Sequence, residues 1–181
     1  MKRSLRRRTR ASAAPASEGI PHLVFRVAGE DYALRLAAVR EVVGLGSLDV
    51  VPGAPTALRG VLEVRGERVA VVDLGALFGG ASGGDPADAC ALVVEGATAE
   101  DEARAGFAVE AVTGVSNVPP EQLTAAPRLL PLIDAGLVAS MARVEERLIP
   151  ILELEPLLGL ADVRGALAVS VDRASSPGGV R

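Results

Sequence analysis

The residue types that carry most enzyme chemistry are scarce in this chain of 181 residues, which contains one histidine, one cysteine and no tryptophan. Acid–base and nucleophilic catalysis need such groups in surroundings that adjust their reactivity. His22 stands beside Pro21 where the first apolar run begins, and Cys90 stands in the run "ACALVV", which predicts a buried, inert thiol. One histidine and one cysteine cannot supply the ligands of a zinc site. The composition therefore predicts a protein that is not an enzyme and has no metal or cofactor.

Two short motifs resemble catalytic or cofactor-binding signatures, but their surroundings differ. "GASGG", residues 80–84, has the G-x-S-x-G spacing of a hydrolase nucleophile turn, which must open a helix and needs a later histidine. Ser82 is followed by Asp85-Pro86 and by no histidine, so the segment is predicted to be a flexible linker. "GLGSLD", residues 44–49, lacks the third glycine of a dinucleotide fingerprint and is predicted to be a loop.

Charge is distributed unevenly along the chain. Residues 1–18 hold six basic side chains and one acidic one, whereas the remainder carries a net charge of −9, which gives −4 in total. We expect residues 1–19 to form a disordered basic arm, because they lack an apolar face. An arginine-rich arm can also bind phosphates, so a nucleic-acid-binding β-barrel is the alternative function. No membrane-spanning stretch is predicted, since Asp134 interrupts the longest apolar candidate.

Short apolar and β-branched runs separated by turn residues predict an all-β sandwich or barrel. The clearest is "LRGVLEVRGERVAVVDL", residues 58–74, which predicts a hairpin with the charged tetrad "RGER" at its bend. Helices are expected to be few and short, and one after Asp73 and one after Glu153 each form one or two turns ended by a glycine. The other strand-like runs lie at residues 23–27, 32–36, 90–95, 106–112, 137–144 and 147–154.

An internal repeat relates the two halves of the chain. Residues 60–79 align without a gap on residues 140–159, at an offset of 80 residues, and both segments have the order strand, strand, short helix, glycine. "YALRLAAV" at 32–39 has a looser counterpart in "FAVEAVTG" at 107–114. The repeat predicts a duplicated β-unit that folds as two small barrels packed together, with the glycine-rich segment 80–84 between the copies.

The order of the longer segments is more specific than any single motif. They are "HLVFRVAGEDYALRLAAVREVV", "VPGAPTALRGVLEVRGERVAVVDLGALFG", "AGFAVEAVTGVSNVPPEQL" and "LLPLIDAGLVASMARVEERLIPILELEPLLG". This order resembles the CheW family of chemotaxis coupling proteins from about residue 21 to residue 160, most specifically from Pro52 to Leu74.

The resemblance implies an all-β fold of two intertwined SH3-like five-stranded β-barrels with short helical turns and no enzymatic activity. It implies a cytoplasmic scaffold that joins the tips of methyl-accepting chemoreceptors to a CheA-type histidine kinase and is recruited to receptor arrays. Residues 20–160 would form the CheW-like domain of two barrel halves, and residues 161–181 a C-terminal extension that is partly disordered. Flagellar motility, pili and gliding are all outputs that fit such a scaffold.

The family's Asn-Leu-Arg-Gly motif falls on residues 63–66, where glutamate replaces the asparagine. Glu63 places a charge near the binding hairpin, and such a charge bears on the choice of partner. Two further departures are Ala70, where the family usually has proline, and Gly75, where it often has arginine. The partner-binding residues that the resemblance implies are Val39, Glu41, Gly60, Arg65 and Gly66.

Arg65 stands at the bend of the hairpin, and its counterpart in the second copy is Glu145, so the fold does not require its charge. We expect Arg65 to pair with Glu41, because the family pattern places both on the same side of the first barrel. A guanidinium can hold a carboxylate with two parallel hydrogen bonds. The alternative is that Arg65 only solvates the turn.

Overall fold

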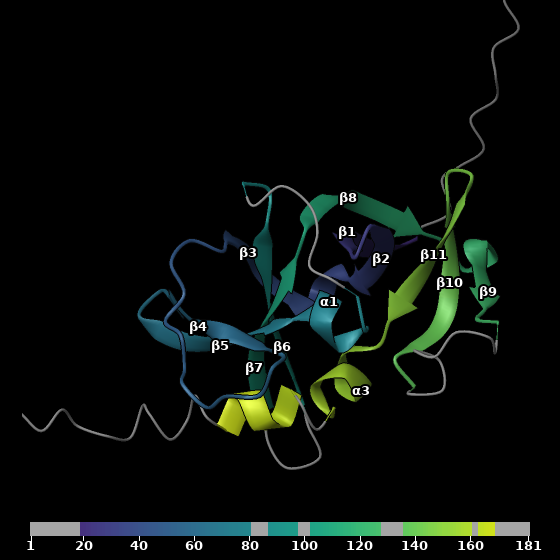
Figure 1. Cartoon of the computed structure of the whole chain (residues 1–181). Coiled ribbons are helices and arrows are strands. Elements are labelled where there is room, and N and C mark those ends of the chain that lie inside the picture. Colours follow the sequence, from purple (N-terminus) through teal and green to yellow (C-terminus); the bar gives the residue numbers. More distant parts are fainter. Residues whose placement is uncertain (1–18, 81–86, 98–101, 128–135, 161–162, 169–181) are drawn as a thin grey trace, which may run out of the picture.

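The computed structural model describes residues 19–80, 87–97, 102–127, 136–160 and 163–168 (Figure 1). These residues form eleven strands in two sheets, together with a few short helices. The basic arm predicted at the N-terminus lies outside the described residues, except for Gly19.

The first sheet has five strands in the order β3-β6-β7-β5-β4. After β3 the chain returns across the open side of this sheet, where Asp49 forms an antiparallel bridge to Val61 of β4. The sheet thereby closes into a small barrel, called the first barrel below. Its strands are β3 (Val39–Gly44), β4 (Leu58–Val64), β5 (Glu67–Asp73), β6 (Cys90–Ala97) and β7 (Glu102–Val109).

The second sheet has six strands in the order β8-β1-β2-β11-β10-β9. Strand β8 also contacts β10, so this sheet closes on itself as the second barrel. The all-β prediction of two packed barrels is confirmed, and the second barrel differs from the expected five strands only by the short strand β9. Its strands are β1 (Ile20–Val27), β2 (Glu30–Arg35), β8 (Ala111–Val118), β9 (Leu123–Ala125), β10 (Val138–Val144) and β11 (Arg147–Leu152).

The predicted hairpin of residues 58–74 is formed by β4 and β5, which are joined by the two residues Arg65 and Gly66. Both residues have a positive φ, of 52° and 82° respectively. A two-residue turn of this type matches the right-handed twist of the flanking strands, and glycine accepts its second position without strain. The turn therefore projects the Arg65 side chain from the tip of the hairpin.

The two predicted short helices are present as α1 (Leu74–Leu77) and α3 (Leu154–Leu158). The Asp73 carboxylate accepts a hydrogen bond from the Ala76 N–H at 3.1 Å, which caps the start of α1. Two single-turn 3₁₀-helices, η1 (Leu36–Ala38) and η2 (Pro120–Gln122), precede β3 and β9. In the part of the chain that the structure describes, no helix has the length and apolar character needed to cross a bilayer.

The internal repeat is confirmed element by element, because β4, β5 and α1 correspond to β10, β11 and α3 at the same offset of 80 residues. An irregularity in strand pairing recurs as well. The register of β4 shifts between Leu58 and Gly60, and that of β10 shifts between Val138 and Ser140. The two copies therefore share an irregularity in strand register in addition to the order of their strands.

Each copy also makes one parallel strand pair. Val71 of β5 lies opposite Gly106 of β7, and Ile151 of β11 lies opposite Ala33 of β2. Since Val71 and Ile151 are equivalent in the repeat, Gly106 is the counterpart of Ala33. The looser sequence alignment placed this counterpart two residues later, at Ala108, which keeps the same face of the strand but misplaces its pairing.

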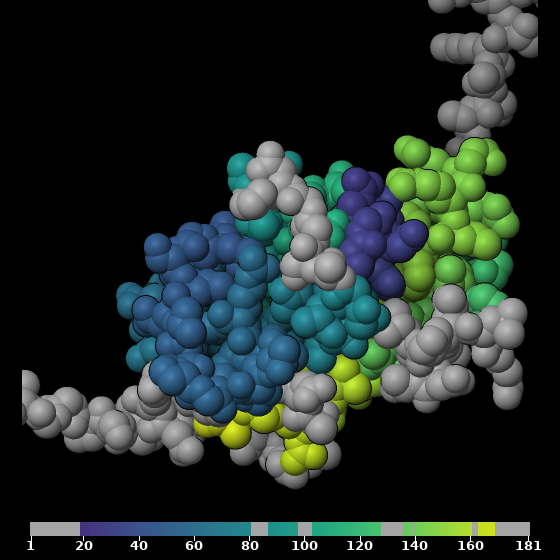
Figure 2. All heavy atoms as spheres, in the orientation of Figure 1, coloured from purple at the N-terminus to yellow at the C-terminus, as the bar shows by residue number. Residues whose placement is uncertain are grey.

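Each repeat contributes its first hairpin to the barrel formed by the rest of the other repeat. Hairpin β1–β2 pairs with β8 and β11, whereas hairpin β6–β7 pairs with β3 and β5. Figure 2 shows the purple atoms of the first described residues lying against light-green atoms from near the end of the chain. The glycine-rich segment 80–84 lies between the two copies of the repeat in the sequence, as expected, but β5 before it and β6 after it belong to the same sheet, so it does not mark a boundary between the barrels.

The largest group of buried side chains lies between the two barrels and includes Phe25 of the second and Phe107 of the first. A helical segment at residues 163–168 completes this core, since Val163 and Ala166 are both fully buried in it. Part of the segment that the sequence assigns to a C-terminal extension is therefore packed into the folded body.

Candidate partner-binding site on the first barrel

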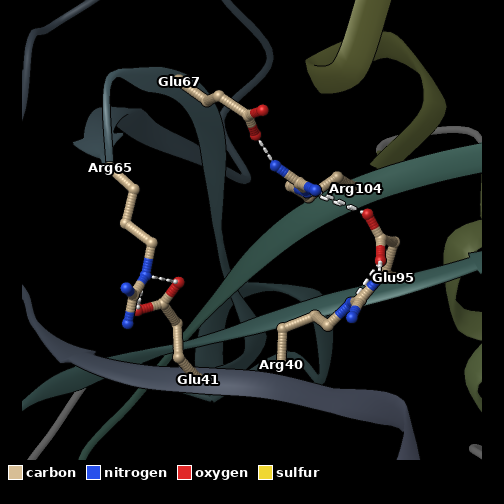
Figure 3. A network of polar contacts seen from close by, with 6 residues as sticks. All are labelled: Arg40, Glu41, Arg65, Glu67, Glu95 and Arg104. Carbon is tan, nitrogen blue, oxygen red and sulfur yellow. Dashed lines mark hydrogen bonds and ion pairs between the residues drawn. The ribbon is translucent and has the colours of Figure 1, made fainter.

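Glu41 and Arg65 come from opposite edges of the first sheet, and closure of the barrel brings them into contact. The Arg65 Nε–H donates to both carboxylate oxygens of Glu41, at 3.0 Å to Oε1 and 3.1 Å to Oε2 (Figure 3). The predicted pair is present in the structure. Its geometry differs from the expectation, because one N–H is shared between two oxygens in place of two parallel hydrogen bonds.

The Glu41–Arg65 pair lies at the surface. The hydrogen bond to Glu41, and secondarily the charge of that carboxylate, raise the pKa of the Arg65 guanidinium. The Arg65 side chain is 81% exposed, compared with 24% for Glu41. Solvent screens an ion pair at this exposure, so the pair adds little to the stability of the fold.

Four further charged side chains, called the first-barrel ladder, continue across neighbouring strands (Figure 3). Glu95 accepts hydrogen bonds from Nη2 and Nε of Arg104, at 2.6 Å and 3.2 Å, and its other oxygen accepts from Arg40. Arg104 also pairs with Glu67 at the start of β5. Because the signs alternate from strand to strand, every neighbouring pair is attractive. The ladder consists of Arg40 on β3, Glu95 on β6, Arg104 on β7 and Glu67 on β5.

A depression of about 380 Å³ lies among these side chains. Its floor is formed by Val64, Val69 and Val93, which are buried and pack together. The Glu41–Arg65 pair and most of the ladder form its rim. An apolar floor within a charged rim is typical of protein–protein contact surfaces, where the apolar part supplies affinity and the charges select the partner.

The structure brings three of the five predicted partner-binding residues together at this rim. Glu41 and Arg65 form the pair, and Gly66 completes the turn that carries Arg65. Val39 is the first residue of strand β3. Its side chain is half-buried and packs against the core between the barrels. The fifth residue, Gly60, is buried within β4.

Gly60 lies where β4 passes close beside the loop that follows β3. Its φ is 152°, and a Cβ at this position would lie 2.9 Å from the carbonyl oxygen of Asp49 and 3.0 Å from the Leu48 Cβ. A side chain would therefore force the loop and the strand apart. Gly60 can influence a partner surface only through the path of the strand that it permits.

The first-barrel ladder was not found from the sequence. One signal was available, because the β6–β7 hairpin places Glu95 directly opposite Arg104, and such cross-strand charge pairs are expected in hairpins. Arg40 and Glu67 come from strands whose neighbours the sequence does not reveal.

Two exposed side chains extend from the strands that form the rim. Val42 on β3 is 43% exposed. Glu63 on β4 is also exposed, and among the described carboxylates of the first-barrel strands it alone forms no hydrogen bond or ion pair. Both residues are free to contact a partner.

The single histidine and the single cysteine lie away from this rim. His22 is 3% exposed, and its Nδ1 lies 2.7 Å from the carbonyl oxygen of Ile20. Cys90 is buried as predicted, and burial raises the pKa of its thiol, although a backbone hydrogen bond from Val112 lowers it. Among the described residues, no cluster of histidine, cysteine and acidic side chains could hold a metal ion.

Comparison with known proteins finds relatives over most of the chain. The family model of the CheW-like domain matches residues 21–162. The probable chemotaxis protein CheW of Rhizobium etli is 24% identical over 144 residues, which cover 80% of this chain and 90% of that protein. The chemotaxis protein CheW of Klebsiella aerogenes is 24% identical over 140 residues, which cover 77% of this chain and 82% of that protein.

The fold matches as well. The crystal structure of the scaffolding protein TtCheW from Thermoanaerobacter tengcongensis is similar with a TM-score of 0.69 and 28% sequence identity, over 80% of this chain and 95% of that one. Sequence and fold thus agree over both barrels, the first of which carries the candidate site. The chain belongs to the CheW-like domain family.

Proposed function

We propose that the chain is a non-catalytic scaffold that couples the cytoplasmic tips of methyl-accepting chemoreceptors to a CheA-type histidine kinase, in chemotaxis or a related motility pathway. The observation that carries the proposal is the similarity in both sequence and fold to a scaffolding protein over 80% of the chain. The relatives named as chemotaxis proteins support the same assignment. No comparison supports the alternative of a nucleic-acid-binding barrel.

The site that we assign to partner binding is the rim of the first barrel. Glu41, Arg65 and Gly66 contribute directly, whereas Val39 and Gly60 act through the position of their strands. A surface of valines, arginines and glutamates suits recognition, since it combines an apolar floor with directed charges. A scaffold of this kind would act in the cytoplasm and reach receptor arrays through its partners.

A reconstitution with purified components tests this proposal. Receptor signalling fragments in vesicles and the cognate kinase are mixed with or without the full chain, and kinase autophosphorylation is measured with and without attractant. We expect the chain to increase kinase activity several-fold and to make that activity respond to attractant. Equal activity with and without the chain, together with no binding to either partner, would overturn the proposal.

A further inference from the structure

Closure of the first barrel depends on one short contact between its edges. The loop between β3 and β4, residues 45–57, pairs with β4 at a single residue, Asp49, whose backbone exchanges two hydrogen bonds of 2.9 Å with Val61. In the second barrel a strand, β9, occupies the corresponding place and pairs with three residues of β10. Thr124 of β9 lies opposite Met141, which is the counterpart of Val61 in the repeat. The first barrel therefore has less local pairing than the second to hold its edges together.

Segment 163–168 has one buried face and one exposed face. Val163 and Ala166 are both 0% exposed, and Leu167 beside them is half-buried against the same core. Arg164 and Ala168, on the other side, are exposed. Residues three and four apart share one face of a helix, so this pattern shows a helical turn that packs along one side. The segment lies beyond residues 21–162, the part of the chain that the family model matches.

The buried face of this segment meets the loop between β3 and β4. Val51 and Ala57 of the loop are buried in the same group of packed side chains as the segment. The two backbones also approach closely, since a Cβ on Gly165 would lie 3.5 Å from the Cγ of Pro55. Figure 1 shows the yellow helical segment beside the blue loop that leads into β4. The loop is thus supported from below by the segment and held to β4 by one bridge.

The same loop determines whether the partner-binding rim is complete. Glu41 and Arg65 come from opposite edges of the first sheet, so their contact depends on the closure of the barrel. Besides the bridge at Asp49, the loop is joined to the end of β5, because the Asp73 N–H donates to the Ala57 carbonyl at 2.8 Å. A shift of the loop would therefore move the edges of the barrel and separate the pair at the rim.

We infer that segment 163–168 positions the partner-binding rim. By packing on the loop between β3 and β4 it keeps the first barrel closed, and closure keeps Glu41 in contact with Arg65. Val163 and Ala166 touch no partner in this account and are positioning residues. The inference rests on the proposed function for the statement that the rim binds partners, whereas the closure of the barrel is a property of the chain alone.

A merely structural role for the segment leads to a different expectation. If the segment only adds apolar contacts to the core, weakening it lowers the stability of the whole molecule and leaves the rim unchanged in molecules that stay folded. If the segment positions the rim, weakening it loosens the loop within the folded molecule, because local opening costs less free energy than global unfolding. The two roles are therefore separable under conditions where the variants are folded.

Hydrogen exchange provides the first test. Val163→Ala removes two methyl groups from a fully buried valine, and Val118→Ala removes the same groups from a valine that is 1% exposed inside the second barrel. Both variants should melt a few degrees below the wild type. Only Val163→Ala should speed the exchange of the Asp49 and Val61 amide protons in the folded state, by about fivefold or more. The Glu153 amide, which bonds the Leu137 carbonyl at 2.8 Å in the second barrel, is the internal reference and should keep its rate.

Kinase activation provides the second test. In the reconstitution with receptor fragments and kinase, the concentration of Val163→Ala that gives half-maximal activation should rise about fivefold, whereas Val118→Ala should match the wild type. Val163→Ile retains the apolar contact and should restore both the exchange rates and the activation. Leu167→Ala removes a half-buried side chain from the same face and replaces Val163→Ala in both tests if that variant does not fold.

Equal exchange rates in the valine variants of the segment and of the second barrel would overturn the inference. Faster exchange at Asp49 and Val61 with unchanged activation would overturn it as well, because the rim would then not depend on closure. If the wild-type chain neither binds nor activates the kinase, it is the proposed function that fails, and the exchange rates still decide whether the segment holds the barrel closed.

Discussion

At the scale of single residues, the Glu41–Arg65 contact is an exposed ion pair that adds little to the stability of the fold, and we propose that it shapes a partner-binding surface. The second copy of the repeat has Gly114 and Glu145 at the corresponding places, yet the second barrel forms all the same. The pair is therefore a feature of one barrel alone. Its position across the mouth of that barrel fixes the side chains that a partner would meet.

A double-mutant cycle measures this effect. Glu41→Ala and Arg65→Ala should each weaken kinase or receptor binding, and the double variant should lose less than the product of the single losses, with a coupling of about fivefold or more. Melting temperatures should change little, because the pair is exposed. Arg68→Ala, on the same hairpin, is the control that should show no coupling to Glu41→Ala. Strictly multiplicative losses would contradict the assigned role.

The pKa of Cys90 gives a prediction about alkaline pH. Burial raises the pKa of this thiol above its usual value of 9.0, so folding favours the protonated form. The resulting stabilisation is fully present below the unfolded-state pKa and is lost as the pH rises through the higher native value. Urea unfolding from pH 7 to pH 10.5 should therefore show a steeper loss of stability above about pH 9 for the wild type than for Cys90→Ala. Parallel curves of stability against pH for the wild type and Cys90→Ala would contradict the raised pKa of Cys90.

At the scale of elements, the two barrels depend on close approaches that small residues permit. Strand β4 runs against the loop after β3 at Gly60, and that contact closes the first barrel. The segment 163–168 reaches the same region, since a Cβ on Gly165 would lie 3.5 Å from the Cγ of Pro55. The loop between β3 and β4 is thus held from two sides.

Replacing Gly60 tests the first of these contacts. Gly60→Ala should lower the free energy of unfolding by about 2 kcal/mol, because it combines a strained φ with a clash against backbone. Gly44→Ala, also in a first-barrel strand, is the control: nothing lies within 4 Å of a Cβ there. Chemical denaturation of both variants provides the comparison. A Gly60→Ala variant as stable as Gly44→Ala would refute this account of the close contact between β4 and the loop after β3.

Replacing alanines in segment 163–168 tests whether this segment packs into the core. Ala166 is fully buried and Ala168 is exposed, so the same substitution can be made on both faces of one helical turn. Ala166→Asp should cost about 3 kcal/mol or more because it buries an unpaired charge, whereas Ala168→Asp should stay within about 0.5 kcal/mol of wild type. Equal stability of the two variants in urea unfolding would mean that the segment does not belong to the core.

At the scale of the whole molecule, the exchange of first hairpins ties the barrels into one unit. The first barrel is formed by the consecutive strands β3 to β7, which lie between the two parts of the second barrel, β1–β2 and β8–β11. The second barrel therefore forms only from strands on both sides of the first in the sequence. The core between the barrels adds apolar contacts from both. The molecule is therefore expected to unfold in one step.

Equivalent substitutions in the two barrels test this cooperativity. Val71 and Ile151 occupy the same place in the two repeats, and both are buried. Val71→Ala and Ile151→Ala should each cost about 2 kcal/mol and should shift one and the same calorimetric transition. The ratio of van't Hoff to calorimetric enthalpy should remain near one. A variant that splits the transition in two would show that the barrels unfold separately.

The local parts of this fold were predictable from the sequence, whereas the pairing of distant strands was not. The hairpin at residues 58–74, the two short helices and the offset of the repeat follow from turn residues and from alternating apolar positions. Alternation tells which face of a strand is buried but not which strand lies beside it. Hence the strand patterns do not reveal the ladder across β3, β6, β7 and β5, and the exchange of hairpins was anticipated only in that the family resemblance implies intertwined barrels. The Glu41–Arg65 pair was anticipated only because of the family resemblance.

The exchanged hairpins have a consequence for the ancestry of the chain. Two identical subunits that trade their first hairpin form a domain-swapped homodimer, and fusing the end of one subunit to the start of the other yields the connectivity seen here. In such a dimer both halves must carry the same side chains, because one gene encodes them. Fusion removes that constraint while keeping the scaffold. The first barrel carries the row Glu95, Arg104 and Glu67, and the second barrel carries Arg26, Asp31 and Arg147 at the equivalent places. Only after the fusion could the two barrels acquire these opposite charges.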